Sequence, residues 1–329
     1  MITRASNASG RARDGARASE RTGDARPRER RGRPARAFDA SAGATEASAS
    51  AGGTRAVAFT FRSHERRALE ALRDACGPLT RAETPTPADA ARKTNERAGI
   101  TTTTEVWRSS RLRRVRSTYV DGGEAAQVFN LVAYPSPSAP DAPVLGIDLI
   151  CVGKGSARKV LIGVDLQPMS RDRGYAATYV PTLLALRERG GRLESAAAAL
   201  NATTPSNKFY EDAKFFSQGM FFARPLETSE EVMKTSLEVV EAYVDVWLAR
   251  LDEAEREAEA MDGACKFGLS LEDVRRCVLT EKTAREAQDA LDAWQLEHDP
   301  AIPMFTGWYG EEWSTAFAQH VLFPGDSAL

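Results

Sequence analysis

A series of short apolar segments separated by tight turns is the feature that most constrains the fold of this chain. Two of these turns, Asp121-Gly122-Gly123 and Gly153-Lys154-Gly155, contain the glycines that hairpin connections favour. Arginine and valine alternate at the start of the segment Arg113–Val120, which is typical of a half-buried strand. The spacing therefore predicts an antiparallel meander. Its expected strands are Glu105–Ser109, Arg113–Val120, Ala126–Tyr134, Val144–Val152 and Lys159–Leu166.

The hydrophobic period changes to that of helices after Pro168. Ser229 with Glu231 nearby suggests a capping box, and Pro300 forbids a helix from continuing past His298-Asp299. The expected helices are Ser63–Ala75, Tyr175–Glu188, Asp212–Phe222, Ser229–Met261, Leu271–Leu296 and Glu311–Leu322; a strand-like Val57–Phe61 and a Pro- and Thr-rich loop, Gly77–Thr104, flank the first of them. One sheet of five or six strands followed mainly by helices predicts a single α+β domain, residues 56–329, with helices on both sheet faces.

The N-terminal segment, residues 1–55, has the composition of an unfolded chain. It contains twelve Arg, no Lys and six acidic residues, a net charge of +6, which leaves −8 to residues 56–329. Its large apolar residues are Met1, Ile2 and Phe38, so it cannot bury enough surface to offset chain entropy. Because it is N-terminal, Arg- and Ser-rich, acid-poor and without a secretory apolar stretch, we expect an organelle transit peptide. A basic tail that binds RNA or membranes is the alternative.

Several classes of function are disfavoured by charge and residue spacing. The folded part is acidic and lacks the positive charge with which nucleic-acid-binding domains neutralise phosphates. No run of eighteen apolar residues exists, so no membrane span is expected. The four cysteines form no CxxC pair and the three histidines no HExxH motif, so we expect neither a dedicated metal site nor a disulfide scaffold.

The segment Gly153-Lys154-Gly155-Ser156 is a faint match to phosphate-binding loops. In a P-loop, Ser or Thr follows the lysine directly, whereas Gly155 follows it here. In a dinucleotide fingerprint a third glycine stands where this chain has Arg158. A hairpin turn is the better interpretation, and nicotinamide, flavin and ATP chemistry lose their usual sequence support.

Two polar residues, Asn130 and Asp148, lie within apolar strand-like segments. A polar side chain in such a place needs a partner or a function. A structural hydrogen bond or an outward-facing side chain explains each residue as well as a functional site does. Asp165 poses the same question at the end of a strand, where a capping or turn role is the better interpretation.

The segment His298-Asp299-Pro300-Ala301 ends a predicted helix just before a cluster of aromatic residues. An Asp before Pro is normally part of a turn, and His298 is more typical of a surface or capping histidine than of a catalyst. The aromatic residues Phe215, Phe216, Phe221 and Phe222 fit either the core or the wall of a pocket for a flat ligand, and periodicity does not separate these alternatives.

Five segments share a further pattern: Gln127–Tyr134, Pro143–Asp148, Val164–Pro168, Lys214–Pro225 and His298–Phe323. Their residues, order and spacing resemble those of the ferredoxin-dependent bilin reductases along nearly all of residues 105–323. The resemblance implies an α/β/α sandwich with a central antiparallel sheet flanked by helices. It also implies an open-chain tetrapyrrole held between the sheet and the C-terminal helices, with no bound organic cofactor and no metal.

The resemblance assigns roles to individual residues. Asp148 matches the family's sheet aspartate, which is thought to protonate the bilin, and Asp299 matches the second aspartate on the helical side of the pocket. Asn130 stands where the phycocyanobilin-forming branch has a catalytic histidine, and that branch's glutamate corresponds to Ser117 or Thr118. The chain is therefore more similar to the branch that contains phytochromobilin synthase and the phycoerythrobilin-pathway enzymes, where asparagine is usual.

Two further residues match family positions near the bilin. They are Ser217 and Arg224, and Arg224 would suit a propionate of the substrate, although a surface salt bridge explains it equally well.

The function that the resemblance implies is that of an enzyme acting on CH–CH groups with an iron–sulfur protein as donor. Biliverdin IXα, or a dihydrobiliverdin, would be reduced to a phytobilin by one-electron transfers from reduced [2Fe–2S] ferredoxin. Aspartates in a dry pocket would supply the protons, because burial raises the pKa of a carboxyl. We expect a monomer in the plastid stroma. The alternatives are a non-catalytic bilin-binding or bilin-delivery protein of the same fold and an unrelated plastid α+β enzyme.

Overall fold

The structure, a computed structural model, describes residues 59–82, 90–205, 208–267 and 277–325. The predicted transit peptide, residues 1–55, lies outside the described residues and stays a prediction. The predicted strand Val57–Phe61 is described from residue 59 onward, and residues 59–61 are not part of a strand.

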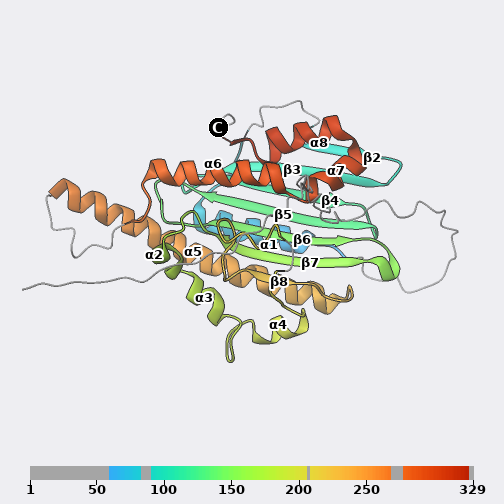
Figure 1. The fold of residues 1–329 in the computed structure, drawn as a ribbon, viewed down its shortest axis with the longest axis horizontal. Helices are drawn as coiled ribbons and strands as arrows, with labels where there is room; N and C mark the ends of the chain where they lie inside the picture. The colour runs from blue at the N-terminus through green and yellow to red at the C-terminus, as the bar shows by residue number, and fades with distance from the viewer. Residues whose placement is uncertain (1–58, 83–89, 206–207, 268–276, 326–329) are drawn as a thin grey trace, which may run out of the picture. The chain divides into compact units, whose positions relative to one another are not determined.

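An antiparallel sheet forms the centre of the described part of the chain (Figure 1). Its strands are β1 (Thr80–Arg81), β2 (Arg92–Asn95), β3 (Ile100–Arg108), β4 (Leu112–Asp121), β5 (Ala126–Pro135), β6 (Val144–Val152), β7 (Lys159–Gln167) and β8 (Phe221–Ala223). Neighbours follow the order β1-β3-β4-β5-β6-β7-β8, and β2 also pairs with β3. The predicted meander is confirmed as β3–β7. The sequence prediction missed β1, β2 and β8 because strands of two to four residues are too short to show an alternating pattern.

The Gly153-Lys154-Gly155 turn joins β6 to β7 as a hairpin, as predicted. Gly153 has a φ of +94°, and a Cβ at this position would lie 2.6 Å from the carbonyl oxygen of Ala157. Glycine is therefore required by the turn itself, without any phosphate ligand.

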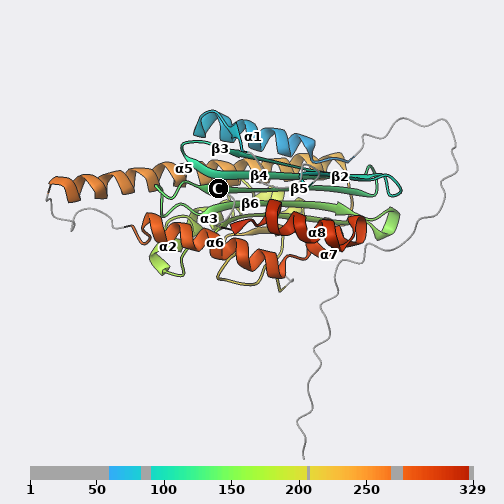
Figure 2. The same cartoon turned by 90° about the horizontal axis from the view of Figure 1, so that it is seen from above.

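Helices cover both faces of this sheet. They are α1 (Arg62–Cys76), α2 (Arg173–Ala177), α3 (Val180–Ala185), α4 (Glu194–Ala199), α5 (Glu230–Phe267), α6 (Glu281–His298), α7 (Ala301–Tyr309) and α8 (Glu311–Phe317), with a short 3-10 turn at Gly155–Ala157 and a π-helical turn at Ala318–Leu322. Figure 2 shows α1 and α5 on one side of the strands and α6, α7 and α8 on the other. The predicted α/β/α sandwich is confirmed.

The predicted helix Asp212–Phe222 is wrong. Residues 208–220 form turns, and the last residues of the predicted range belong to β8. The helical spacing of the phenylalanines misled the prediction, because they pack in different directions: Phe216 lies against the aromatic side chain of Tyr210, and Phe221 lies in the sheet against Tyr243 of α5.

Two other helix predictions differ from the structure in their bounds. The predicted helix Tyr175–Glu188 is divided into α2 and α3, and Pro181 stands in the first turn of α3, where proline is tolerated. The predicted helix Leu271–Leu296 begins only at Glu281, after the N-cap Thr280, whose hydroxyl accepts from the amide of Thr283. Residues 271–276 lie outside the described residues.

The start of the C-terminal helical region was also missed. Pro300 does end α6, but α7 begins at the next residue, because proline fits the start of a helix and Asp299 accepts a hydrogen bond from the amide of Ala301 at 2.7 Å. The region Gly77–Thr104, predicted as a loop, contains β1, β2 and the first part of β3.

The core on the α5 side is built around Trp247, which is fully buried. Its indole N–H donates to the carbonyl of Pro143 at 2.7 Å, which ties α5 to the start of β6. A second apolar cluster lies under α7 and α8, where the rings of Trp313 and Phe317 stack with centroids 4.5 Å apart. The sheet is therefore buried on both faces.

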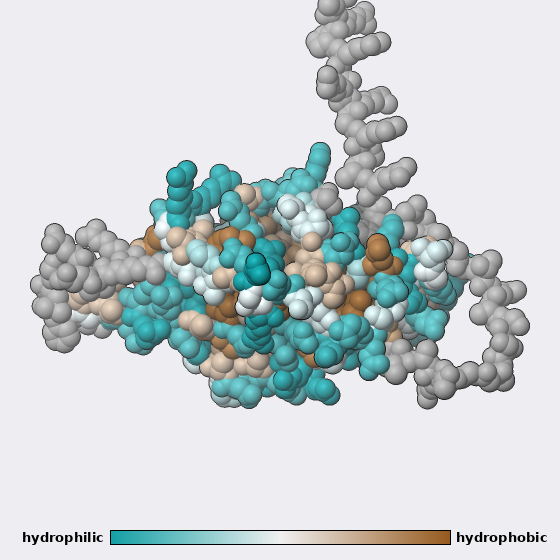
Figure 3. Space-filling model, turned by 90° about the horizontal axis from the view of Figure 1, so that it is seen from below, coloured by the Kyte–Doolittle hydropathy of each residue, from teal (hydrophilic) through white to brown (hydrophobic). Residues whose placement is uncertain are grey.

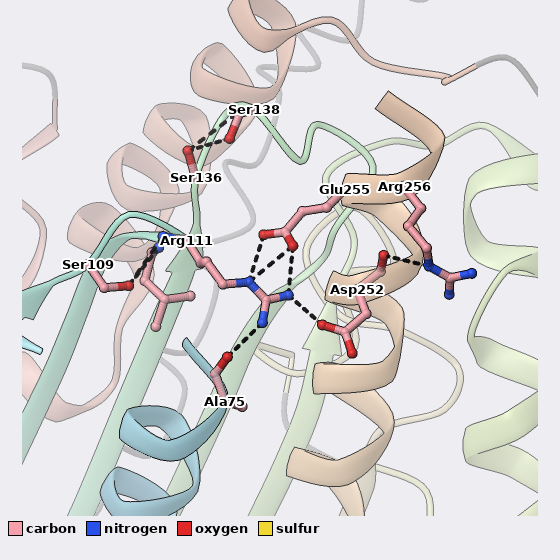
Figure 4. Close-up of polar contacts among 9 residues, drawn as sticks. Ala75, Ser109, Arg111, Ser136, Ser138, Asp252, Glu255 and Arg256 are labelled. Carbon is pink, nitrogen blue, oxygen red and sulfur yellow. Dashed lines mark hydrogen bonds and ion pairs between the residues drawn. The ribbon is translucent and has the colours of Figure 1, made fainter. Parts of the chain in front are cut away.

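Arg111 connects the β3–β4 turn to both helices on the α5 side (Figure 4). Its guanidinium group donates from Nε to both carboxylate oxygens of Glu255, at 2.9 and 3.0 Å, and from Nη2 to Asp252. Nη1 donates to the carbonyl of Ala75 near the end of α1 at 2.7 Å. Such a forked arrangement uses the planar geometry of arginine and fixes α1 against α5.

The side of the molecule that carries α2, α3 and α4 presents a mainly hydrophilic surface with small separate hydrophobic patches (Figure 3). The free edge of β8 is partly covered here, because Ala202 forms a bridge with Ala223 and the amide of Thr203 donates to Phe222. None of the described helices is both long and apolar enough to cross a lipid bilayer.

Candidate active site

A cavity of about 1100 Å³, part of it open to solvent, lies between the sheet and the C-terminal helices. Strands β4 to β7 form its floor, and α6, α7 and the turn segment Phe209–Met220 form its roof. Most of the lining is apolar. Its polar side chains are Arg116, Thr118, Asn130, Asp148, Asp165, Gln167, Tyr210, Gln295 and Asp299.

The floor carries a row of directly paired residues that crosses four strands. Thr118 of β4 pairs with Asn130 of β5, Asn130 with Asp148 of β6, and Asp148 with Gly163 of β7. Residues that pair directly point to the same face of a sheet, so the register gathers these side chains in the cavity. Ser117 points to the opposite face, where its hydroxyl donates to Glu65 of α1 at 2.9 Å. Of the two residues that the resemblance left open, Thr118 is the one beside Asn130.

Asp148 is held by two donors. Tyr210 donates its hydroxyl proton to Oδ2, and the amide Nδ2 of Asn130 lies 3.4 Å from Oδ1. Burial raises the pKa of this carboxyl, while the hydrogen bonds from Tyr210 and Asn130 and the positive charge of Arg116 act in the opposite direction. A carboxyl with a raised pKa holds its proton closer to neutral pH, as a general acid requires.

Asp299 reaches the cavity from the roof, at the end of α6. Burial raises its pKa to about 6, although the amide of Ala301 donates to Oδ1. The negative charge of Asp148 raises the pKa further, and the positive charge of Arg116 lowers it. Asp148 and Asp299 are therefore electrostatically coupled groups on opposite walls of one cavity.

Arg116 is a buried cation beside these two acids. Its Nη1 donates to the hydroxyl of Thr118 at 3.1 Å, and its guanidinium carbon lies 5.6 Å from the ring centre of Phe323. Within the described residues its Nε is buried without a hydrogen-bond partner, and so is Oε1 of Gln295 in the roof. Oε1 of Gln167 in the floor is likewise without a partner among these residues. Buried polar groups are rarely left unpaired, so an unused donor and two unused acceptors at this cavity are suited to a polar ligand.

Asp165 also belongs to the cavity, and its predicted turn or capping role is wrong. It lies within β7, opposite Gly146, with both carboxylate oxygens bonded to Ser217: Oδ1 accepts from the hydroxyl and Oδ2 from the amide at 2.8 Å. Burial raises the pKa of Asp165 to about 7, against these hydrogen bonds. The sequence pattern failed here because the hydrogen-bond partner, Ser217, lies 52 residues further along the chain, where no local pattern reveals it.

The five residues predicted for the site fall into two groups. Asp148, Asp299 and Asn130 line the cavity together. Ser217 does not line it and instead holds Asp165. Arg224 is exposed just after β8, with its guanidinium carbon 5.2 Å from the ring centre of Phe222.

Sequence reasoning missed Arg116 and Tyr210. The alternating pattern of β4 placed Arg116 in a half-buried strand but did not say which face the cavity occupies. Tyr210 lies in a turn outside every predicted element, where no periodic signal exists. The sequence left open whether the phenylalanines belong to the core or to the wall of a pocket. In the structure, Phe216 lines the cavity, whereas Phe221 and Phe222 are buried in β8.

His298 lies beside this site without lining it. Its ring stacks on Trp294 with centroids 5.0 Å apart, and its Nδ1 lies 2.8 Å from the carbonyl oxygen of Trp294, which fits the predicted capping role. Within the described part of the chain, no three His, Cys, Asp or Glu residues are grouped as metal ligands would be.

The sequence profile of the ferredoxin-dependent bilin reductases matches residues 69–324 of this chain. A Gloeobacter violaceus protein named 15,16-dihydrobiliverdin:ferredoxin oxidoreductase is 35% identical, over 72% of this chain and 85% of its own length. A phycoerythrobilin:ferredoxin oxidoreductase of the same organism is 31% identical, over 68% of this chain and 79% of its own length.

The fold has a counterpart among solved structures. The crystal structure of phytochromobilin synthase from tomato in complex with biliverdin superposes with a TM-score of 0.58 at 17% sequence identity, over 80% of this chain and 82% of that one. This likeness concerns the fold alone. On the sequence profile and the two relatives above 30% identity, the chain belongs to the ferredoxin-dependent bilin reductase family.

Proposed function

We propose that this enzyme reduces biliverdin IXα to 15,16-dihydrobiliverdin with electrons from reduced ferredoxin. The observation that carries the proposal is the pair Asp148 and Asp299, two carboxyls of raised pKa on opposite walls of one cavity. The name of the 35% identical relative couples 15,16-dihydrobiliverdin to ferredoxin. A reductase that forms this compound starts from the bilin with two fewer hydrogen atoms, which is biliverdin.

The reaction adds two electrons and two protons to one carbon–carbon double bond. Ferredoxin supplies one electron at a time, so each transfer places negative charge on the tetrapyrrole until a proton arrives. No hydride donor takes part, and the proton source must lie within hydrogen-bonding reach of the bilin. A mainly apolar cavity with a few acids on its walls meets this requirement.

Asp148 is the proposed proton donor on the sheet side. Its raised pKa favours the protonated carboxyl that a donor needs, and its position on a central strand holds the carboxyl rigidly. Asn130, directly opposite in the register, orients the same carboxyl and is the third proposed catalytic residue.

Asp299 is the proposed donor on the helical side. Because it faces a different part of the ligand than Asp148 does, it can protonate a different carbon, and the two acids together supply the two protons of one reduction cycle. Arg116 stabilises the negative charge that each electron creates, and it lowers the pKa of both aspartates so that each can be ionised after proton transfer.

Ser217 and Arg224 have supporting roles in the proposal. Ser217 holds Asp165 and so ties the roof segment Phe209–Met220, in which it lies, to β7. Arg224 is exposed, so it is suited to a propionate that extends out of the cavity into solvent.

An anaerobic assay tests the function. It contains the enzyme, ferredoxin, ferredoxin reductase, NADPH and biliverdin, and we expect the substrate absorbance to fall and one product to coelute with 15,16-dihydrobiliverdin. Omission of ferredoxin should abolish the change, because NADPH does not act directly. An unchanged spectrum with an electron supply that still reduces cytochrome c would overturn the enzyme reading and favour the bilin-binding alternative.

The second candidate product is phycoerythrobilin. The observation that favours it is the 31% identity to a phycoerythrobilin:ferredoxin oxidoreductase. The same assay with 15,16-dihydrobiliverdin as the starting bilin separates the two: we expect no turnover of this compound, whereas its conversion would assign the chain to the later step.

The proposed location is the plastid stroma, with residues 1–55 as a transit peptide that is removed on import. The composition of this segment supports the proposal. Fusion of residues 1–55 to a fluorescent protein should direct it to plastids, and an enzyme that starts at Thr54 should keep full activity. Cytosolic fluorescence, or a large loss of activity, would count against a transit peptide.

A further inference from the structure

Tyr210 is a buried residue of the cavity wall that belongs to neither a helix nor a strand. Its hydroxyl donates to Oδ2 of Asp148, and this hydrogen bond spans 62 residues of sequence. The bond joins the roof of the cavity to the centre of its floor.

The ring of Tyr210 is fixed by its aromatic neighbours. It packs edge-on against Phe209 and Phe216, with centroids 5.0 and 5.3 Å away, and at an angle against Phe222 at 5.5 Å. Phe209 in turn stacks on Trp294 of α6 at 4.9 Å. Because the ring is packed on several sides, the hydroxyl of Tyr210 has a fixed position.

The same turn segment contacts a second carboxyl of the floor. Seven residues after Tyr210, Ser217 donates both its hydroxyl and its amide to Asp165. Two hydrogen-bonded anchors on neighbouring strands therefore hold the segment over the cavity, and the position of Tyr210 does not depend on a single contact.

The two oxygens of Asp148 differ as a result. Oδ2 accepts a hydrogen bond from the hydroxyl of Tyr210, whereas Oδ1 is 3.4 Å from the amide of Asn130, beyond the usual range of about 2.7–3.2 Å. Oδ1 is the less satisfied atom and is free to carry a proton. The phenol itself is a poor acid here, because burial and the charge of Asp148 raise the pKa of Tyr210 well above its usual value.

We propose that Tyr210 is a positioning residue of the bilin reductase reaction, which fixes the carboxyl plane of Asp148 and directs its transferable proton to Oδ1. The proposal rests on the proposed function. The proton that reaches the bilin comes from Asp148, and Tyr210 keeps its own proton throughout. After transfer, the hydroxyl stabilises the carboxylate until a new proton is taken up.

The variant Tyr210→Phe tests this role, because it keeps the ring and removes the hydroxyl. We expect kcat to fall about tenfold or more while the KM for biliverdin changes less than about twofold, since the lost contact acts on Asp148 and not on the substrate. Loss of a donor to the carboxylate raises the pKa of Asp148. In the Asp299→Asn background, which lacks the decline expected from Asp299, the remaining alkaline decline of the rate should therefore move upward by about one pH unit. The double variant Tyr210→Phe/Asp148→Asn should be no slower than Asp148→Asn alone.

Tyr243→Phe is the matched control. Tyr243 of α5 donates to the carbonyl of Gly219 at 2.6 Å, so this variant also loses a buried hydrogen bond to the same turn segment. It should lose some stability and leave the pH profile unchanged. A pH shift of equal size in both variants, or an unshifted profile in Tyr210→Phe, would overturn the positioning role.

A second measurement does not depend on turnover. The infrared C=O band of protonated Asp148, identified by its loss in Asp148→Asn, should persist to higher pH in Tyr210→Phe than in the wild type without any bilin. If the wild type proves inactive but this shift is found, the proposed function fails and the role of Tyr210 towards Asp148 stands. An unchanged band overturns the inference even in an active enzyme.

Discussion

Asn130 and Asp148 face each other from directly paired positions of β5 and β6, with the amide nitrogen of one 3.4 Å from a carboxylate oxygen of the other. Strand register alone creates this relationship, because 18 residues of sequence and a hairpin separate the two. The pair lies at the centre of the cavity floor, where an acid and its neighbour can both touch a bound ligand.

Asp148→Asn should retain the fold and the binding of biliverdin, since the amide preserves the shape of the carboxyl. It should lower the reduction rate on the order of 100-fold or more, because electrons arrive without a matching proton. A long-lived bilin radical should then be visible by electron spin resonance. The control is Asp245→Asn, an exposed residue of α5 paired with Arg192 on the opposite side of the sheet. Wild-type turnover in Asp148→Asn would remove this residue from the mechanism.

Asp299→Asn should give partial reduction or a changed product, since in the proposed function Asp299 protonates another part of the tetrapyrrole than Asp148 does. Its carboxyl has a pKa of about 6, so it loses its proton as the pH rises through 6. A step that uses this proton should therefore slow above pH 6 in the wild type, and the variant should lack this decline. Product chromatography across a pH series checks both points. A variant that keeps the wild-type product and the wild-type pH dependence would contradict the assignment.

Asn130→His should impair turnover without producing phycocyanobilin. The neighbour directly opposite is Thr118, whereas the phycocyanobilin-forming branch has a glutamate in this region. The added imidazole would lie beside Asp148, but the glutamate of that branch would be absent. Retention times against bilin standards provide the measurement. Phycocyanobilin as the main product of the single variant would show that residue 130 decides the product by itself.

Ser217→Ala should destabilise the protein by about 1–3 kcal/mol, because a buried carboxylate loses a hydrogen-bond donor. The pKa of Asp165 is about 7, so the carboxyl is ionised above this pH and needs its donors most there. The loss in unfolding free energy should therefore be larger at pH 8.5 than at pH 6, as urea titrations can show. Ser138→Ala, which affects an exposed hydroxyl paired with Ser136, is the control. An equal loss at both pH values would show that Asp165 does not titrate in this range.

His64 should make the protein less stable in acid. It is fully buried between α1 and α5, with Nε2 2.9 Å from the hydroxyl of Ser236, and burial lowers its pKa from 6.5 to about 4. The unfolded chain binds a proton below 6.5 and the folded chain does not, so its contribution is complete above pH 6.5 and is lost as the pH falls towards 4. Between pH 7 and pH 5 the loss is about 2 kcal/mol.

Urea unfolding of the wild type and of His64→Gln at both pH values isolates this contribution. The aspartates titrate alike in both proteins. The difference between the two proteins in how the free energy of unfolding changes with pH is therefore the contribution of His64. Identical pH dependence in the two proteins would mean that His64 takes up a proton in the folded state.

The central meander and the long helix α5 were predictable from the sequence, because alternating residues, glycine turns and a long apolar stripe are local signals. Polar residues within apolar segments pointed to Asn130 and Asp148, and the family pattern gave these two residues and Asp299 their roles. The helix predicted at Asp212–Phe222 failed because phenylalanines spaced as in a helix serve contacts with β7, α5 and α6 that no local pattern contains. The short strands β1, β2 and β8 form because they pair with neighbouring strands, and no local sequence pattern shows that pairing.

The composition of the cavity was decided by tertiary structure. Sequence alone places carboxyls at 148, 165 and 299 and an arginine at 116, but the register of four strands and the path of α6 bring them to one space. Burial then raises the pKa of the carboxyls, and burial is a property of the packed molecule. Tyr210 is the clearest case: nothing adjacent to it in the chain marks it, and only the folding of a turn over the sheet brings its hydroxyl to Asp148.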